Sequence, residues 1–459
     1  MVGERPRRLK RRENIDRSVR DDVIIPACEA RTATLALAKI PRAADHGVHR
    51  APVHRALRVA AFVPSFPELS ETFILRQIVG LLERGHDVRI FAHEAAPEGP
   101  VHADVDRHQL MRRTRVISGE AAVARGAGGR APAGAFLRCL RPRIARAAGG
   151  WGALVRTLGA LRGEAPFDVV HCHYGVTGLR YGVAARLWRA PLVVSFYGYD
   201  ASRYPRERGE GVYAPLFPAA QRVTSLSPHM DDRLRALGCA PERLRRVPLA
   251  VDATAGDEAP PSRPRSVGEI RLLTVARLVE KKGIDVALRA LAGMRDELTG
   301  LRYDVIGEGP LRGELEALAA SLGVAERVRF LGAATGDDVR RAMREADLFV
   351  LPSMTAKNGD EEGTPTVLIE AAYAKLPVLA TRHAGIPEVV ADGESGMLVA
   401  EGDATALADG LRAMLAGRER WTAMGEAGHR LMIERGHLTT DVAARLEALY
   451  LELLPPRTR

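Results

Sequence analysis

The feature that most constrains this chain is a repeated alternation between short apolar segments and longer amphipathic segments. Residues 58–64 form the first apolar run, and Ile74, Ile78 and Leu81 then recur at helical spacing until Gly85 ends the segment. Strands that alternate with helices in this way build βαβ units and a mostly parallel sheet. Further strands are predicted at 87–92, 168–172, 192–196 and 222–226.

One break interrupts this alternation. Residues 253–268 are rich in Pro, Gly and charge and have no apolar period, which is typical of a linker. The pattern then resumes and predicts a second Rossmann-like α/β domain, with ligands beyond the carboxyl ends of the strands and in the cleft between the domains. The predicted domains are 57–252 and 269–436, preceded by a poorly ordered leader at 1–56. The strands of the second half are predicted at 270–276, 302–306, 327–331, 348–352 and 377–380, with helices over 404–454.

The net charge of +10 is unevenly distributed. Residues 1–50 carry twelve Lys or Arg and seven Asp or Glu, so this segment holds half of the surplus. Such a tail either contacts nucleic acid or anionic lipid or remains a solvated extension, and we expect no nucleic-acid partner. Only six residues of the chain are Lys, which makes the adjacent pair Lys281 and Lys282 stand out.

Several classes of protein are excluded by the composition. No run approaches 18 apolar residues, so no transmembrane helix is expected, and no apolar segment of a signal peptide follows the basic N-terminus. The four cysteines are scattered without a CxxC pair, which argues against a structural zinc site or a disulfide framework. These features fit a protein of the reducing cytoplasm.

The loop after the predicted strand at 348–352 is the most informative. Thr364 and Pro365 predict a helix start, with Thr364 as the N-cap, and such a start offers free N–H groups and a positive dipole end to an anion. Glu362 precedes this cap, and Glu370 lies within an apolar run, where a carboxylate needs a partner. Either acid alone suits a cap or a solvated face, but their spacing across the helix start favours a site.

A second loop of the same half is rich in cations. Arg277, Lys281 and Lys282 precede Gly283, which opens a predicted helix. Guanidinium and ammonium groups beside helix amides suit a diphosphate; the alternative is a charged, solvated turn.

A third loop contains Gly307, Gly309 and Gly313 between a strand and a helix. The spacing departs from the dinucleotide fingerprint, and no acidic residue ends the next predicted strand to hold a ribose. We therefore interpret this segment as a tight turn.

Polar residues also follow strands of the first half. Ser70 is predicted to cap a helix, which makes Glu71 a first-turn acid favoured by the dipole. His171 and His173 lie on one face of a strand, where two imidazoles resemble a metal pair, but no third ligand is evident. We interpret them, with the segment at 197–200, as polar groups that line the cleft.

Ten segments together carry a family resemblance. In the second half they are 275–283 (VARLVEKKG), 305–310, 330–332, 348–353, 362–371 (EGTPTVLIEA), 377–381 and 385–399. In the first half they are 66–88, 171–175 (HCHYG) and 195–200 (SFYGYD). From residue 58 to 450 the chain resembles the retaining glycosyltransferases of family 4, and its first half is similar to the bacterial exopolysaccharide, colanic-acid-type branch. The resemblance implies the GT-B fold, in which two Rossmann-like domains face each other across a cleft and a C-terminal helix, here 437–459, packs back on the N-terminal domain.

The resemblance also implies roles for individual residues. Arg277 and Lys282 would hold the diphosphate of a UDP- or GDP-hexose donor, Glu370 would bind its ribose, and Glu362 would contact the sugar; Lys281 would be a bystander. The implied donor-binding set is completed by Gly307, Glu308, Gly363, Thr364, Pro365 and Thr366. The implied catalytic residues are Glu362, Arg277, Lys282 and Tyr197, and the implied acceptor-side residues are Ser65, Phe66, Glu71, His173 and Asp200. Tyr197 stands where many relatives have a His, and Ser65 and Phe66 lie where some relatives have a Gly-Gly turn.

The implied reaction transfers a sugar with retention, without a metal or other cofactor, to a saccharide or polyprenyl-linked glycan acceptor. Residues 136–146 and 151–161 are basic and apolar, so they either contact an anionic membrane, at the inner face of the plasma membrane, or form ordinary domain helices. Two alternatives remain open at this point: a soluble transferase acting on a small molecule or free sugar, and a non-catalytic sugar-nucleotide-binding protein.

Overall fold

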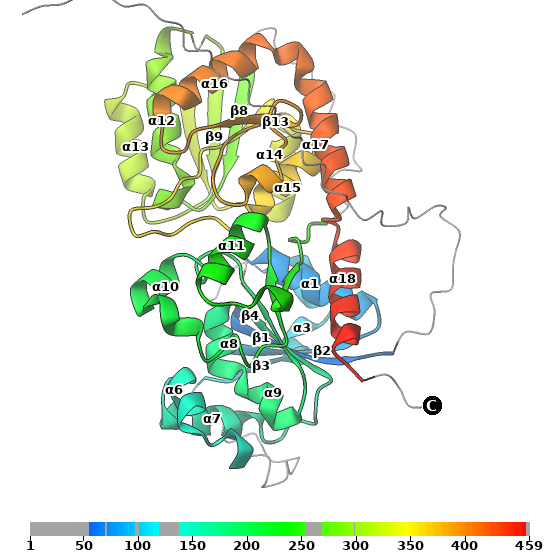
Figure 1. The fold of residues 1–459 in the computed structure, drawn as a ribbon. Helices are drawn as coiled ribbons and strands as arrows, with labels where there is room; N and C mark the ends of the chain where they lie inside the picture. Colours follow the sequence, from blue (N-terminus) through cyan, green and yellow to red (C-terminus); the bar gives the residue numbers. More distant parts are fainter. Residues whose placement is uncertain are drawn as a thin grey trace, which may run out of the picture. The chain divides into compact units, whose positions relative to one another are not determined.

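The computed structural model describes residues 55–68, 71–96, 101–118, 137–252, 269–297 and 299–455, which all belong to the unit that begins at Arg55 (Figure 1). The predicted linker at 253–268 lies outside the described residues, as does the predicted leader except for its last two positions. Two parallel sheets organise the described residues, as the alternation of strands and helices predicts.

The first sheet has seven strands in the order β3-β2-β1-β4-β5-β6-β7, and every pair is parallel. The central strands β4 and β5 are buried along their whole length, because helices cover both faces of the sheet. The strands are β1 (Arg58–Phe66), β2 (Asp87–Ala95), β3 (Thr114–Val116), β4 (Val169–His173), β5 (Leu192–Ser195), β6 (Arg222–Ser225) and β7 (Leu244–Arg246). The helices are α1 (Thr72–Glu83), α2 (Ala103–Arg107), α3 (Leu110–Arg113), α6 (Pro142–Ala147), α7 (Trp151–Leu161), α8 (Gly175–Tyr181), α9 (Val183–Trp188), α10 (Arg203–Arg208) and α11 (Pro228–Ala236).

The second sheet has six strands in the order β10-β9-β8-β11-β12-β13, again all parallel. Its helices α12, α13 and α16 pack on one face, and α14 and α15 pack on the other (Figure 1). The strands are β8 (Ile270–Val275), β9 (Leu301–Ile306), β10 (Val328–Gly332), β11 (Leu348–Leu351), β12 (Val378–Thr381) and β13 (Gly396–Val399). The helices are α12 (Ile284–Gly293), α13 (Arg312–Ser321), α14 (Gly336–Glu345), α15 (Thr366–Tyr373), α16 (Ala404–Ala416), α17 (Trp421–Arg435) and α18 (Thr439–Glu452).

In both sheets the strand order reverses beside the first strand, between β1 and β4 and between β8 and β11. Ligands of open parallel sheets bind outside the carboxyl ends of the strands at this point. The loops that follow β1, β4, β8 and β11 are therefore the places where the fold positions a site.

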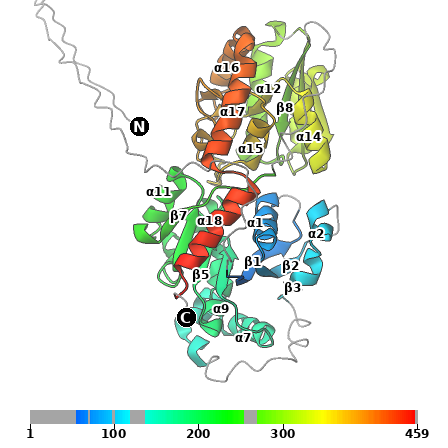
Figure 2. The same ribbon diagram turned by 90° about the vertical axis from the view of Figure 1, so that its right-hand side faces the viewer.

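The C-terminal helix α18 returns to the first sheet, as expected. It lies beside α1 (Figure 2), where Gly80 allows the close approach because a Cβ there would lie 2.8 Å from the Cβ of Ala443. From α18, Tyr450 Oη lies 2.7 Å from Nδ1 of His171 in β4, and Glu447 pairs with Arg84. None of the described helices has the length and apolarity needed to cross a membrane.

Candidate active site

A cavity of about 700 Å³ lies beyond the strand ends, and residues of both halves line it. The first half contributes acids and aromatic rings, and the second half contributes cations, carboxylates and the start of α15. The lining includes Glu68, Glu71, Phe73, Arg76, Tyr174, Tyr197, Arg277, Lys281, Lys282, Gly307, Glu308, Arg340, Glu362, Gly363, Thr364, Pro365, Thr366 and Glu370. All ten residues that the sequence predicts for donor binding therefore lie around one cavity.

A buried ion pair forms the centre of the second-half wall. Lys282 Nζ lies 2.5 Å from Glu362 Oε1, and the two side chains are 12% and 8% exposed. Burial acts to raise the pKa of Glu362, but the nearby Lys282 and Lys281 outweigh it and bring the pKa to about 2. Lys281 turns instead to Asp360 Oδ1 and to the carbonyl of Glu361, both at 3.1 Å. Of the two adjacent lysines, Lys282 is the one that forms the ion pair with the Glu362 carboxylate.

The start of α15 differs from the predicted one. The helix begins at Thr366 with Pro365 as its N-cap, not Thr364, because Pro365 keeps an extended backbone with ψ of 115°. Thr364 is 7% exposed, and its Oγ1 has no hydrogen-bond partner among the described residues. A buried hydroxyl without a partner is costly, and this one belongs to a residue that lines the cavity. The hydroxyl and the first amides of α15 suit an anionic ligand.

Glu370 occupies the first turns of α15 and also lines the cavity. Burial raises the pKa of this carboxyl, and Arg76 and Arg340 oppose the rise. Arg76 comes from α1 in the first half, where it bonds Asp104 Oδ2 at 2.5 Å and Asp252 Oδ2 at 3.0 Å. The charges that act on Glu370 thus come from both halves, although neither arginine forms an ion pair with it in the described part of the chain.

The turn after β9 requires glycine. Gly307 has φ of +138°, and a Cβ at this position would lie 1.9 Å from the carbonyl oxygen of Ala276. The close approach lets the Leu278 amide donate to the Glu308 carbonyl at 2.9 Å, and it brings the loops after β8 and β9 to one edge of the cavity. Arg277 is exposed on this edge, without an ion-pair partner in the described part of the chain. The carboxylate of Glu308 pairs with Arg312.

Two family models match the chain, the one described as Glycosyltransferase Family 4 over residues 70–255 and the one described as Glycosyl transferases group 1 over residues 257–431. The chain is 33% identical over 380 residues to WcaL of Escherichia coli K12, a glycosyltransferase named for colanic acid biosynthesis. The matched region covers 78% of this chain and 90% of WcaL. It is 30% identical over 368 residues to the amylovoran biosynthesis glycosyltransferase AmsK of Erwinia amylovora, with 77% and 89% covered.

The chain belongs to glycosyltransferase family 4.

Solved structures share the GT-B architecture with this glycosyltransferase. Anabaena Alr3699/HepE, crystallised with UDP and glucose, matches with a TM-score of 0.66 at 18% identity, over 87% of this chain and all of that chain. WaaG, a glycosyltransferase involved in lipopolysaccharide biosynthesis, matches with a TM-score of 0.59 at 20% identity, over 85% and 99% of the two chains. At these identities the likeness concerns the fold, which is the predicted one.

Tyr197 lines the cavity of the glycosyltransferase with its ring rather than its hydroxyl. Its Oη lies 2.7 Å from Nδ1 of His173, which is 1% exposed in β4, so the hydroxyl points into the protein. The ring packs between Phe73 and Tyr174, with centroids at 4.7 and 4.9 Å. For the catalytic role that the resemblance implies for Tyr197, its hydroxyl would have to leave His173 to reach a ligand in the cavity.

His173 and Asp200, predicted on the acceptor side, lie behind the cavity wall. Asp200 is fully buried and accepts hydrogen bonds from the amides of Tyr197, Gly198 and Gly175. Burial raises its pKa to about 6 although these amides favour the charged form. Asp200 therefore holds the loops after β4 and β5 together, and His171, predicted beside His173, instead bonds Tyr450 and Ser195 in the interior.

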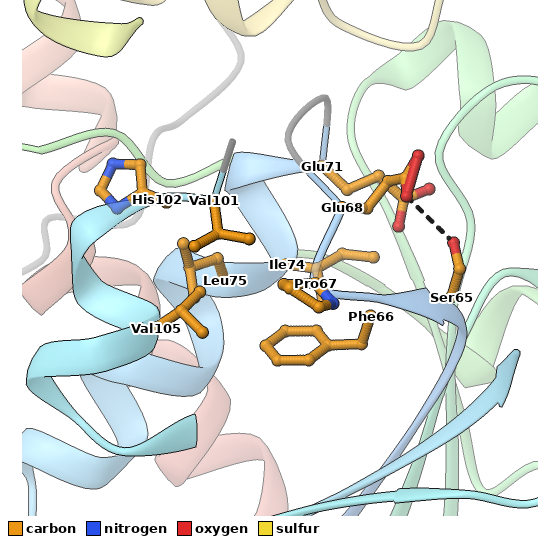
Figure 3. A pocket seen from close by; sticks show the side chains of 10 residues that line it. All are labelled: Ser65, Phe66, Pro67, Glu68, Glu71, Ile74, Leu75, Val101, His102 and Val105. Atoms are coloured by element: carbon orange, nitrogen blue, oxygen red, sulfur yellow. Dashed lines mark hydrogen bonds between the residues drawn. The ribbon is translucent and has the colours of Figure 1, made fainter. Parts of the chain in front are cut away.

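Ser65, Phe66 and Glu71 lie together beside the main cavity, around a small pocket (Figure 3). Glu68 and Glu71 project side by side there, and Ser65 Oγ donates to Glu68 Oε2 at 3.3 Å. Ser70, the predicted N-cap, lies outside the described residues, and Glu71 itself is the N-cap of α1, without a side-chain bond to the helix. Glu71 borders both the small pocket and the main cavity.

One positioning pair was not predicted from the sequence. His383 is 3% exposed, and its Nε2 accepts a hydrogen bond of 3.1 Å from the Glu362 amide. Because Nε2 accepts, the ring proton of a neutral His383 must lie on Nδ1, which faces the Glu401 carboxylate. His383 and Glu401 thus orient the backbone of Glu362. In the sequence, only the position of His383 just after a predicted strand pointed to such a role.

Among the described residues no group of three His, Cys, Asp or Glu side chains is placed to hold a metal ion. The cationic side chains that line the cavity are Arg76, Arg277, Lys281, Lys282 and Arg340.

Proposed function

We propose that this glycosyltransferase moves a hexose from a nucleotide-sugar donor to a saccharide or polyprenyl-linked glycan, with retention, in the synthesis of an exopolysaccharide or cell-surface glycan. The observation that carries the proposal is the buried pair Lys282–Glu362 beside the first amides of α15, with Arg277 on the same cavity. Support comes from AmsK and WcaL, named for amylovoran and colanic acid biosynthesis, and from HepE, which was solved with UDP and glucose.

The proposed donor lies with its diphosphate between the cations and the helix start. Arg277 and Lys282 compensate its charge, the amides after Pro365 and the Thr364 hydroxyl donate to its oxygens, and Glu370 accepts from the ribose hydroxyls. Glu362, held ionised by the adjacent lysines, accepts from hydroxyls of the sugar. Gly307 and Glu308 border the same end of the cavity.

Stabilisation of the leaving group is the proposed source of catalysis. As the bond between the sugar C1 and the phosphate oxygen breaks, negative charge grows on the diphosphate, and preorganised donors stabilise it; removal of one such donor typically costs about 3–4 kcal/mol. Because the cations and amides already supply this charge, we expect transfer without added divalent metal. Attack from the same face as the leaving group would give retention, which the anomeric coupling of the product reports by NMR.

A donor panel tests the proposal. UDP-, GDP- and ADP-hexoses are incubated with polyprenyl-diphosphate sugars or with free sugars, and nucleotide release and product formation are measured. We expect one nucleotide class and the lipid-linked acceptors to be used, and Lys282→Ala and Glu370→Ala to weaken donor binding at least tenfold. Lys357→Ala is the matched control, since Lys357 is exposed and lies outside the cavity. Unchanged donor binding in both variants would contradict the site, and exclusive use of free sugars would favour a soluble role.

We propose that this protein is located in the cytoplasm and binds the inner face of the plasma membrane. Four large apolar side chains are exposed in the region of α6 and α7. Two precede α6, Leu137 (70% exposed) and Leu140 (41%), and two lie in α7, Trp151 (51%) and Val155 (57%). Exposed arginines accompany them: Arg138, Arg141, Arg143, Arg146 and Arg156. Apolar side chains framed by cations suit an anionic lipid surface.

Vesicle sedimentation tests the membrane proposal. The protein should sediment with phosphatidylglycerol vesicles at low salt and be released by high salt, and Trp151→Ser with Val155→Ser should reduce the bound fraction. Equal sedimentation with neutral phosphatidylcholine vesicles, or none with either kind, would contradict it.

A further inference from the structure

Glu361, the residue before the proposed sugar contact Glu362, reaches from the second half into the first. Its Oε2 lies 3.2 Å from His229 Nε2 in α11, and its Oε1 lies 3.4 Å from Arg206 Nη2 in α10. Its backbone amide donates a hydrogen bond of 3.2 Å to Ser202 Oγ. These contacts leave the side chain of Glu361 only 13% exposed. Three side chains of the first half therefore hold one residue of the loop after β11.

The second half holds Glu361 from the other side. Lys281 Nζ donates to the Glu361 carbonyl and to Asp360 Oδ1, both at 3.1 Å, and Lys281 is 8% exposed. The amide, the carbonyl and the carboxylate of Glu361 are thus all engaged, as buried polar groups require. Lys281, for which the resemblance implies no role, helps to fix this loop.

The backbones of the two halves come into contact at this point. Gly198, in the loop after β5, has φ of +146°, and a Cβ there would lie 2.9 Å from the amide nitrogen of Gly363 and 3.3 Å from the carbonyl oxygen of Glu361. In the loop after β11, Gly359 has φ of +77°, and a Cβ there would lie 1.9 Å from Arg206 Nη1. Glycine is suited to both positions, so the close contact is built into the backbone.

The next residue turns to the second half instead. Glu362 pairs with Lys282, and its amide donates to His383 Nε2 at 3.1 Å. Because Glu361 and Glu362 share one planar peptide unit, a shift of the first moves the second. A displacement of about 1 Å in a group that positions a substrate can cost about a hundredfold in rate. The first half can therefore influence the carboxylate of Glu362 without touching it.

We propose that Glu361 is a positioning residue through which the first half fixes Glu362 against the sugar of the donor. This inference rests on the proposed function, in which Glu362 accepts from hydroxyls of the sugar and other residues bind the diphosphate. Loss of the tether should therefore weaken the binding of a nucleotide sugar more than that of the nucleoside diphosphate alone. The tether is Glu361 with its three partners in the first half: Ser202, Arg206 and His229.

Binding measurements on the full-length protein test the effect on the sugar. Glu361→Ala and the double variant Arg206→Ala/His229→Ala are titrated with the nucleotide sugar that wild type uses and with the nucleoside diphosphate. We expect each to weaken the nucleotide sugar about fivefold or more and the diphosphate by no more than about twofold. Glu361→Gln keeps an oxygen for His229 and should recover part of the loss. Asp232→Asn, in α11 and paired with Arg235 of the same helix, is the matched control and should bind both ligands as wild type does.

Combination of the variants shows whether the contacts act as one tether. In the Arg206→Ala/His229→Ala background the carboxylate of Glu361 has already lost these two partners. Adding Glu361→Ala should therefore weaken the nucleotide sugar by no more than about a further twofold. Fully additive losses would contradict a shared path between the halves.

Hydrogen exchange of the protein without a donor tests the tether itself. The amides of Glu361 and Glu362 donate to Ser202 Oγ and to His383 Nε2 in wild type. Glu361→Ala should raise the exchange rate of residues 359–363 and leave that of α12 unchanged, since only the local contact is lost. An unchanged rate in the loop, or an equal rise in α12, would overturn the positioning role.

The binding data also separate this inference from the proposed function. Equal weakening of the nucleotide sugar and the diphosphate by Glu361→Ala, or no weakening of either, would overturn the inference while the proposed function stands. If wild type binds no nucleotide sugar, the proposed function fails and the effect on the sugar fails with it. Hydrogen exchange then still decides whether the first half holds the loop.

Discussion

The two walls of the cavity place carboxylates in opposite electrostatic states. In the second half, Glu362 is buried against Lys282 and Lys281, and its pKa falls to about 2. In the first half, Glu71 lies against a neutral Tyr174 and near Glu68, and its pKa rises to about 7. Both residues follow a strand of a parallel sheet, and both are largely withdrawn from solvent, Glu362 buried and Glu71 half-buried, so burial alone does not decide their charge. The nearby cations decide whether the carboxyl is ionised. The second-half wall, which holds these cations, therefore suits an anion, and the first-half wall suits uncharged hydroxyl groups.

The largest effect should come from breaking the pair that defines the second wall. Lys282→Ala leaves Glu362 buried without its closest cation, and loss of one partner of a buried pair typically costs about 3–5 kcal/mol. Chemical denaturation at pH 7 measures this loss. The double variant Lys282→Ala/Glu362→Gln removes both charges and should recover most of the stability; no recovery would contradict the pairing.

The same pair has a pH signature. The folded-state pKa of Glu362 lies below the ordinary value of 4.5, so its ionisation stabilises the fold fully above about pH 4.5, and this contribution fades as pH falls toward 2. The stability of wild type relative to Glu362→Gln should follow that curve.

Separation of the two walls should have the next largest effect. A Cβ on Gly363 would lie 1.9 Å from the carbonyl oxygen of Tyr197 and 3.0 Å from Leu226. Gly363→Ala should therefore cost about 1–3 kcal/mol in unfolding free energy and weaken donor binding and acceptor use together. Gly293→Ala, in α12 with no atom within 4 Å of its Cβ, is the control and should be neutral or slightly stabilising. Equal behaviour of the two variants would show that the walls do not meet at this point.

A smaller effect is expected from the pair that orients Glu362. His383→Leu leaves the buried Glu362 amide without its acceptor, which costs about 1–3 kcal/mol. We expect a higher KM for the donor with kcat reduced less. His383→Gln can return an acceptor oxygen to the amide and should recover part of the affinity; identical KM values in both variants would remove the positioning role.

The smallest effect is expected at Tyr197. Because its hydroxyl faces His173 and not the cavity, Tyr197→Phe should cost about 1 kcal/mol of stability and change kcat less than threefold. A fall in kcat of a hundredfold or more would show that the hydroxyl turns to the transferred sugar.

The sequence predicts the central strands of both sheets well and most of the edge strands poorly. Every predicted strand is present, including the partly exposed edge strand β10, and the central ones were recognisable because a strand buried on both faces has a continuous apolar run. The strands that were missed, β3, β7 and β13, have three or four residues and lie at sheet edges, where charged or half-exposed positions interrupt the run.

The site shows the same division. The loops after β8 and β11 were identified because their motifs are contiguous in sequence, and Lys282 was distinguished from Lys281. The electrostatic influence of Arg76 on Glu370 was not predicted, because it joins helices of the two halves. Side-chain direction was also not predictable, so Asp200 and His173 were expected at the cavity but lie behind its wall.

The central claim is that Lys282 and the start of α15 bind the diphosphate of the donor. Equilibrium binding of a nucleoside diphosphate and of the same nucleoside, to wild type and to Lys282→Ala, tests it directly. We predict that Lys282→Ala weakens the diphosphate at least tenfold and leaves the nucleoside within twofold, with Lys357→Ala unchanged for both. Equal weakening of both ligands, or of neither, would contradict the claim.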